Sequence, residues 1–141
     1  MKNTYFLPLG GTGEIGMNLN LYGYGENNKT DWIMVDCGVT FSQFGLPGID
    51  LQMPDPTFIA SQKDKLKGVI LTHAHEDHIG AMPFIWPFFN CPIYTTQFTA
   101  SLLIEKFDEY NIDYEGKLKI LSEGDIINIS SFEIKAIGLT H

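Results

Sequence analysis

The stretch LKGVILTHAHEDHIG occupies residues 66–80 and joins a short apolar run to three of the four histidines of the chain. Residues 69–71, Val-Ile-Leu, have the composition of a strand that is buried on both faces. The polar residues begin directly after them. The stretch therefore predicts a buried strand with a histidine-rich loop at its carboxyl end.

This loop carries the pattern H-x-H-x-D-H within six consecutive positions, at His73, His75, Asp77 and His78. Imidazole and carboxylate groups are ligands that zinc and manganese accept. In an extended loop, residues two apart point to the same side, so His73 and His75 can converge on one ion. Asp77 and His78 require the chain to turn after His75, and this pair suits a second ion close by. The alternative is a solvated turn that is rich in histidine by chance, which the crowding of the motif disfavours.

Other polar or ionisable groups near the motif are interpreted without a metal. Glu76 is expected to face solvent. Cys37 and Cys91 are expected to be small buried hydrophobic residues rather than ligands. Asp36, at the end of another apolar run, either caps that strand or hydrogen-bonds the metal-bearing loop from behind.

Composition limits the class of protein. With 141 residues, of which 44% are hydrophobic, the chain is the size of one domain with a real core. Its net charge of −8 argues against a broad basic face for nucleic acid. Bound metal ions would nevertheless offer positive charge directly to a phosphate.

The two cysteines lie far apart without a CxxC spacing, which favours a reducing compartment over a disulfide framework. The amino terminus lacks the pattern of a signal peptide. The most apolar later stretch, residues 79–89, is interrupted by Pro83 and Pro87 and is well short of the roughly 20 residues that a membrane span needs. We expect a soluble, cytoplasmic protein with no membrane association.

Apolar periodicity and turn residues predict an α/β layered domain. A helix over residues 96–111 is expected to have Thr96 as its N-cap and an apolar face of Ala100, Leu103, Ile104 and Phe107. Residues 38–56 are expected to be irregular. Short helices are predicted over 56–65 and 80–89, and strands over 4–9, 17–25, 32–36, 69–71, 91–96, 117–121, 125–129 and 132–139.

The glycine-rich segment GGTGEIG, residues 10–16, contains a GxGxxG pattern, and Asp36 follows twenty residues after Gly16. This is the spacing of a dinucleotide-binding fingerprint, which requires a helix to start in the glycine turn. Residues 17–31 are rich in asparagine and glycine and have an apolar spacing of two, so no helix fits there. A tight turn between two antiparallel strands is the favoured interpretation.

The motifs HAHEDH, LGGTGEIGMN, VDCGVTF, PGID, PDPTF and LTHAHEDHIGAMP together resemble a known family. HAHEDH is the metal motif of the metallo-β-lactamase superfamily, shared with glyoxalase II, lactonases and lactamases. The GEIGMN opening narrows the resemblance to ribonuclease J, of the β-CASP branch. The resemblance covers residues 5–141.

The resemblance implies an αββα sandwich, of which this chain would be the amino-terminal half, and two metal ions, zinc with manganese as a possible substitute. His73, His75 and His141 would hold one ion, and Asp77 and His78 would belong to the other. Asp77 would also orient the nucleophile as the catalytic residue, and Asp36 would support the loop from behind the ligands. The implied activity is hydrolysis of RNA phosphodiester bonds, both 5′-to-3′ exonucleolytic and endonucleolytic.

The resemblance also implies a longer protein. Residues 1–141 would be a metallo-β-lactamase-like domain that is incomplete at its carboxyl end, without the β-CASP domain. RNA binding and homo-oligomer formation would belong to the full-length protein, and the fragment alone would be inactive. Two other functions stay open at this point: a small-molecule thioester or lactone hydrolase, and a metal-binding fragment without catalysis.

Overall fold

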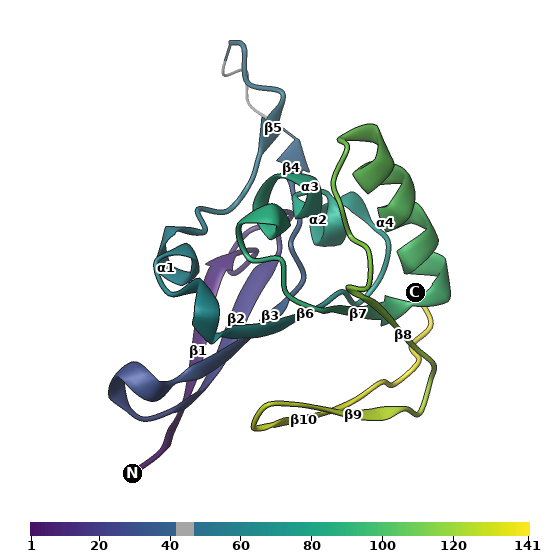
Figure 1. Ribbon diagram of the computed structural model, residues 1–141. Coiled ribbons are helices and arrows are strands. Elements are labelled where there is room, and N and C mark those ends of the chain that lie inside the picture. Colours follow the sequence, from purple (N-terminus) through teal and green to yellow (C-terminus); the bar gives the residue numbers. More distant parts are fainter. Residues whose placement is uncertain (42–46) are drawn as a thin grey trace.

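The computed structural model describes residues 1–41 and 47–141, which are built around a six-stranded sheet. The helices lie on one face of this sheet, and a two-stranded hairpin lies on the opposite face (Figure 1). In the order of the sheet, the strands are β1 (Asn3–Gly10), β2 (Leu19–Gly25), β3 (Asp31–Val35), β6 (Leu66–Ile70), β7 (Ile93–Thr96) and β8 (Leu118–Leu121). The α/β layers that the sequence predicts are therefore present.

The direction of the strands decides where polar side chains gather. β1, β2 and β3 are antiparallel, whereas β3, β6, β7 and β8 run parallel. Val35 of β3 is paired with Ile70 of β6, so both strands end at the same edge of the sheet. The segment after β3 begins at Asp36 and the segment after β6 begins at Leu71, so these two segments are neighbours.

The glycine segment is the turn between β1 and β2, and no helix starts in it. Gly11, Gly13 and Gly16 adopt φ values of 86°, 77° and 103°, which L-residues rarely adopt. The prediction of a turn between antiparallel strands is confirmed. A dinucleotide-binding fingerprint is excluded because the helix terminus that would bind the pyrophosphate does not exist.

The main helix is α4 (Gln97–Glu109), and it forms as the sequence predicts. Thr96 is its N-cap and accepts a hydrogen bond from the Thr99 backbone N–H at 3.4 Å. Ala100, Leu103 and Phe107 are buried. Phe107 stacks on Trp86 with ring centroids 5.2 Å apart, which fixes α4 against the helical segments over the sheet.

The short helices are more broken than predicted. Over residues 56–65, α1 (Thr57–Ala60) is followed by a separate 3₁₀ turn, Lys63–Lys65. Over residues 80–89, α3 (Met82–Ile85) gives way to a 3₁₀ turn, Trp86–Phe88, because Pro87 cannot donate the next helical hydrogen bond. None of the described helices has the length and hydropathy that a membrane crossing requires.

Strand boundaries and one strand pairing also differ from the prediction. β2 begins at Leu19 because Met17, with φ of 33°, leaves the strand and its N–H bonds to Val39 O. β3 ends before Asp36, where φ is 65°. In the segment predicted to be irregular, β4 (Thr40–Phe41) pairs with β5 (Leu51–Gln52), and residues 42–46 lie outside the described part.

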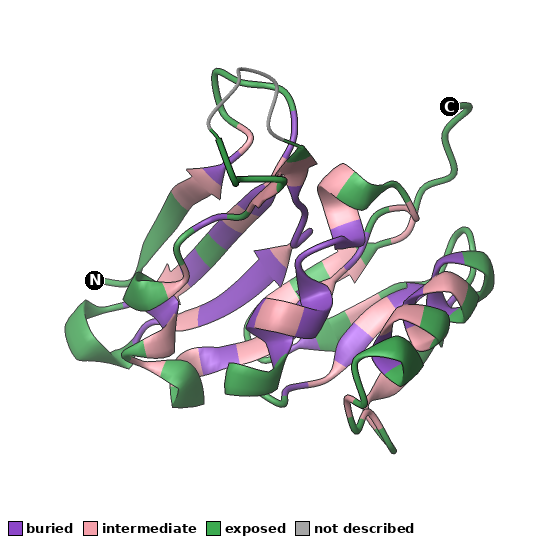
Figure 2. Ribbon diagram, turned by 90° about the horizontal axis from the view of Figure 1, so that it is seen from above, coloured by how far each residue is buried: buried purple, intermediate pink, exposed green. Residues whose placement is uncertain are grey.

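The hairpin of β9 (Ile126–Ile129) and β10 (Phe132–Lys135) begins a second layer below the sheet. Its buried Ile129 lies over Gly68 of β6, and Ser130 donates a hydrogen bond to Asp31 of β3. β10 ends four residues earlier than predicted, and residues 137–141 are exposed (Figure 2). Helices, sheet and the start of a second sheet are the layers expected for the amino-terminal half of an αββα sandwich.

Candidate metal centre

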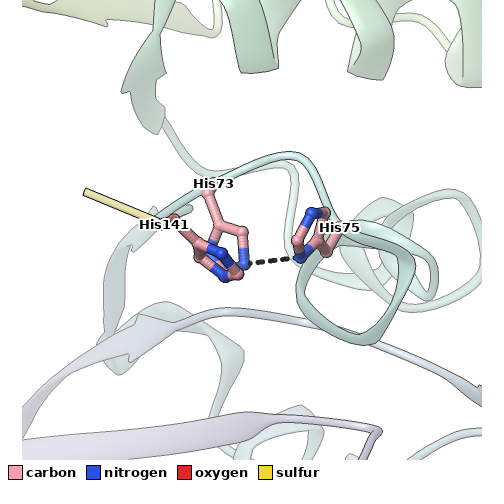
Figure 3. Close-up of side chains that lie close together, drawn as sticks. All are labelled: His73, His75 and His141. Carbon is pink, nitrogen blue, oxygen red and sulfur yellow. Dashed lines mark hydrogen bonds between the residues drawn. The ribbon is translucent and has the colours of Figure 1, made fainter. Parts of the chain in front are cut away.

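The loop after β6 and the last described residues bring three histidines together. Each of His73, His75 and His141 offers one imidazole nitrogen as a ligand atom. These three nitrogens lie within 4.8 Å of one another. Figure 3 shows the three rings facing a common space, with His73 Nε2 3.2 Å from His75 Nδ1. Among the described residues, this is the one group of three such side chains. Three imidazoles are a donor set that zinc accepts in sites with three protein ligands.

Asp77 and His78 form an adjacent pair. The loop is extended at His75, which is the N-cap residue of α2 (Glu76–Ile79), and the chain turns there into the helix. This turn brings Asp77 Oδ2 to 3.4 Å from His78 Nε2, and the His78 ring lies 4.0 Å from that of His73 between centroids. The pair thus stands beside the three histidines, and the assignment of its side chains to a second metal stays a prediction.

Asp36 lies beneath the loop and is 5% exposed. Its carboxylate accepts hydrogen bonds from the Thr72 N–H at 2.8 Å and from the Thr72 hydroxyl, at 3.0 Å to Oδ1 and 2.9 Å to Oδ2. His78 Nδ1 lies 2.7 Å from Asp36 Oδ2. Of the two sequence interpretations, these contacts favour support of the loop over a cap of strand β3.

The pKa values of two histidines move in opposite directions. Burial lowers the pKa of His73, and the neighbouring His78 and His75 add to this effect, which favours the neutral imidazole that binds metals. Burial acts in the same sense on His78. There, the hydrogen bond and charge of Asp36, with the charge of Asp77, outweigh burial and raise the pKa of His78.

Gly38 permits a contact between the segment after β3 and α2. A Cβ atom at Gly38 would lie 1.7 Å from the carbonyl oxygen of Asp77. Around it, backbone N–H groups of Cys37 and Val39 donate to the carbonyls of His78 and Glu76 at 2.8 and 3.0 Å. The proposed ligand loop is therefore held by backbone hydrogen bonds on the side of α2. The sequence alone did not reveal this role, although Gly38 stands in the VDCG motif.

Asn18 is a second residue whose role the sequence alone did not reveal. Its Nδ2 donates to the Asp77 carbonyl oxygen at 3.0 Å, and lies 3.3 Å from Asp77 Oδ2 and 3.4 Å from His78 Nε2. The glycine turn makes room for it, because a Cβ at Gly11 would lie 2.3 Å from Asn18 Oδ1. Asn18 belongs to the GEIGMN motif, which was the available signal.

The residues predicted to stand outside the site do so. Glu76 is exposed, and its carboxylate forms an ion pair with Lys106 of α4. Cys37 and Cys91 are buried and not joined by a disulfide. Burial raises the pKa of Cys91 to about 11 and that of Cys37 further, so neither offers a thiolate at neutral pH.

If Asp36 supports the metal through the loop, Asp36→Asn should weaken zinc binding by about 10- to 100-fold, the usual range for partners behind the ligands. The fold should persist, because asparagine has the same shape. Isothermal titration with zinc, alongside circular dichroism, measures both. Loss of folding without a separable effect on zinc affinity would assign Asp36 a purely structural role.

The sequence of the chain is similar to those of known proteins. Residues 22–141 match the sequence model of the Metallo-beta-lactamase superfamily. Ribonuclease J of Sinorhizobium meliloti is 52% identical over 136 residues, which are 96% of this chain and 24% of that protein. Ribonuclease J of Helicobacter pylori is 40% identical over 135 residues, 95% of this chain and 19% of that protein. The chain thus spans about a quarter or less of the length of these relatives.

Solved structures agree on the fold. A B3 metallo-beta-lactamase with an active-site glutamic acid has a TM-score of 0.58 over 94% of this chain and 48% of its own, at 12% identity. The resemblance to ribonuclease J that the sequence motifs indicate is confirmed by the relatives above. With the family model covering most of its length and the same layers in its structure, the chain belongs to the metallo-β-lactamase superfamily.

Proposed function

We propose that this chain forms part of a metal-dependent ribonuclease, in which it contributes the amino-terminal portion of the metallo-β-lactamase domain. The observation that carries the proposal is the meeting of His73, His75 and His141 within 4.8 Å, in a chain 52% identical to a ribonuclease J. The proposed substrate is RNA, cleaved both 5′-to-3′ and internally. The same identity gives no support to a thioester or lactone hydrolase.

The donor atoms of the site fit zinc, with manganese as a second candidate. His73, His75 and His141 would hold one ion, and Asp77 and His78 would contribute to another. When bound, such ions supply a water of lowered pKa and stabilise negative charge on the phosphoryl oxygens. They would also bring cationic charge to a chain with a net charge of −8 that must meet a polyanion.

The protein groups have their own tasks in this proposal. Asp77 orients the attacking water through its carboxylate, and Asn18 holds Asp77 in place through the 3.0 and 3.3 Å contacts to its carbonyl and carboxylate oxygens. Asp36 holds His78 through the 2.7 Å contact at Nδ1, which leaves Nε2 directed toward Asp77. We place this activity in the cytoplasm, since the buried thiols of Cys37 and Cys91 are unpaired and suit a reducing compartment.

The direct test is RNA cleavage by the protein encoded in the complete reading frame. A 5′-labelled RNA should be degraded with zinc or manganese present and should stay intact with a chelator or in the His73→Ala variant. A full-length protein that binds zinc but leaves RNA intact, and instead hydrolyses a thioester or lactone, would overturn the proposal.

The 141-residue chain alone should bind about one equivalent of zinc tightly, because three histidine donors meet at one position, whereas Asp77 and His78 are only two. One ion cannot clamp both the attacking and the leaving oxygen of a phosphodiester, so the chain alone should not cleave RNA. Zinc titration and the same RNA assay measure this. A two-site isotherm together with metal-dependent cleavage by the purified chain would contradict it.

A further inference from the structure

Thr72 stands between the buried carboxylate of Asp36 and the first histidine of the motif. Its hydroxyl oxygen lies 3.0 and 2.9 Å from the two carboxylate oxygens of Asp36. On its other side, the same oxygen lies 3.0 Å from His73 Nδ1. No sequence pattern pointed to this position beyond its place directly before the histidine motif.

The number of hydrogens decides how these contacts are made. A carboxylate only accepts hydrogen bonds, and a threonine hydroxyl carries one hydrogen. If that hydrogen pointed to His73, the hydroxyl and carboxylate oxygens would face each other with lone pairs alone. The hydroxyl therefore donates to Asp36 and accepts from His73, so His73 carries its proton on Nδ1 and presents the lone pair on Nε2.

His78 contacts the same carboxylate directly. His78 Nδ1 is 2.7 Å from Asp36 Oδ2 and donates its hydrogen there, while His78 Nε2 faces Asp77 Oδ2 at 3.4 Å. His73 Nε2 in turn faces His75 Nδ1 at 3.2 Å, inside the group of three histidines. One carboxylate thus directs the Nε2 atoms of two histidines, one toward each proposed ion.

We propose that Thr72 is a positioning residue that relays the hydrogen-bond direction of Asp36 to His73 and so fixes the Nδ1–H tautomer of His73. The tautomer follows from the contacts alone. Its value for metal binding rests on the proposed function, since a directed Nε2 lone pair matters only if His73 is a ligand.

The tautomer is measured first, without metal. In the 141-residue chain with ¹⁵N-labelled histidine, at about pH 8.5, roughly two units above the ordinary histidine pKa, long-range ¹H–¹⁵N spectra distinguish Nδ1–H from Nε2–H rings. A His73→Gln variant assigns the resonance. Wild-type His73 should be the Nδ1–H form. An Nε2–H form in the wild type would overturn the inference without any variant.

Two substitutions then test the hydroxyl. Thr72→Val removes it and should shift His73 toward a mixture of tautomers, whereas Thr72→Ser should keep the wild-type form. Thr95→Val is the matched control, because the buried Thr95 hydroxyl donates to Leu71 O at 2.9 Å, next to Thr72, rather than to a histidine. It should leave the His73 tautomer unchanged. A Thr72→Val protein with unaltered His73 would refute the relay.

Zinc affinity is the second readout. Thr72→Val should weaken zinc binding by about 10- to 100-fold, Thr72→Ser should restore it, and Thr95→Val should match the wild type. If Thr72→Val changes the His73 tautomer but leaves zinc affinity at the wild-type level, Thr72 has no positioning role in metal binding. If the tautomer depends on Thr72 but the wild-type chain binds no zinc, the proposed function fails while the relay stands.

Discussion

Gly38→Ala should destabilise the chain by about 4 kcal/mol or more, at the upper end of what single substitutions cost. The new methyl carbon would lie 1.7 Å from the Asp77 carbonyl oxygen and 2.6 Å from the His78 nitrogen. Both are backbone atoms, so no side chain can rotate away. Relief requires α2 to separate from the segment after β3, which breaks the hydrogen bonds of Cys37 and Val39 to α2. Urea denaturation of variant and wild type measures the loss.

A control at Gly116 separates the steric effect of an added methyl group from the effect of backbone conformation. Gly116 has a φ of 73°, and a Cβ atom added there would meet nothing within 4 Å, so Gly116→Ala tests left-handed strain alone. It should cost about 1–2 kcal/mol. Gly38 is not among the positive-φ glycines, so its larger effect would come from the close approach alone. Equal, small losses at both positions would show that α2 and the segment after β3 are not in contact.

His73→Ala should abolish tight zinc binding by the chain. The substitution removes one of three imidazoles whose nitrogens lie within 4.8 Å of one another, and two donors remain. The loss of zinc affinity should exceed about 10- to 100-fold, which is the usual effect of removing a residue that only hydrogen-bonds a ligand. His75→Ala should behave alike. Zinc titration with a competing chelator gives the affinities, and circular dichroism shows whether the fold survives.

Glu76→Ala provides the comparison within the same loop. Glu76 is exposed and ion-paired with Lys106, so its removal should leave zinc affinity nearly unchanged. An ion pair at the surface, with Glu76 exposed and Lys106 half-buried, contributes on the order of 1 kcal/mol to stability. Equal losses of zinc affinity in all three variants would contradict the assignment of His73 and His75 as ligands and of Glu76 as a bystander.

The parts of the site that are adjacent in the chain could be predicted from the sequence. His73, His75, Asp77 and His78 are recognisable because metal-binding residue types crowd together after a buried strand. His141 came only from the family resemblance, since a single histidine 63 or more positions away carries no local signal. The main helix was equally predictable, because its N-cap and its apolar face lie within one segment.

The supporting residues could not be found in this way. Asn18 contacts Asp77, 59 positions along the chain, and Thr72 contacts Asp36, 36 positions away. Gly38 acts through the absence of a Cβ atom next to Asp77, about 40 positions away. Neither feature leaves a periodic pattern. The role of Asp36 is ambiguous in the sequence for a related reason: a carboxyl group after a strand has the same sequence pattern whether it caps that strand or contacts the neighbouring strand. The parallel pairing of β3 with β6, which brings Thr72 within hydrogen-bonding distance of Asp36, favours the second.

The position of His141 makes the proposed zinc ion a crosslink. It would join the loop after β6 to an exposed segment beyond β10, and so close a loop of 65 residues between His75 and His141. This loop contains α2, α3, β7, α4, β8 and the β9–β10 hairpin. Unlike a disulfide, a zinc ion that binds only when the three imidazoles meet would leave the unfolded chain unconstrained, and it would stabilise the folded chain by preferential binding to it. The three imidazoles can meet only after all these elements are in place, so zinc would be captured late in folding and would lock the completed arrangement.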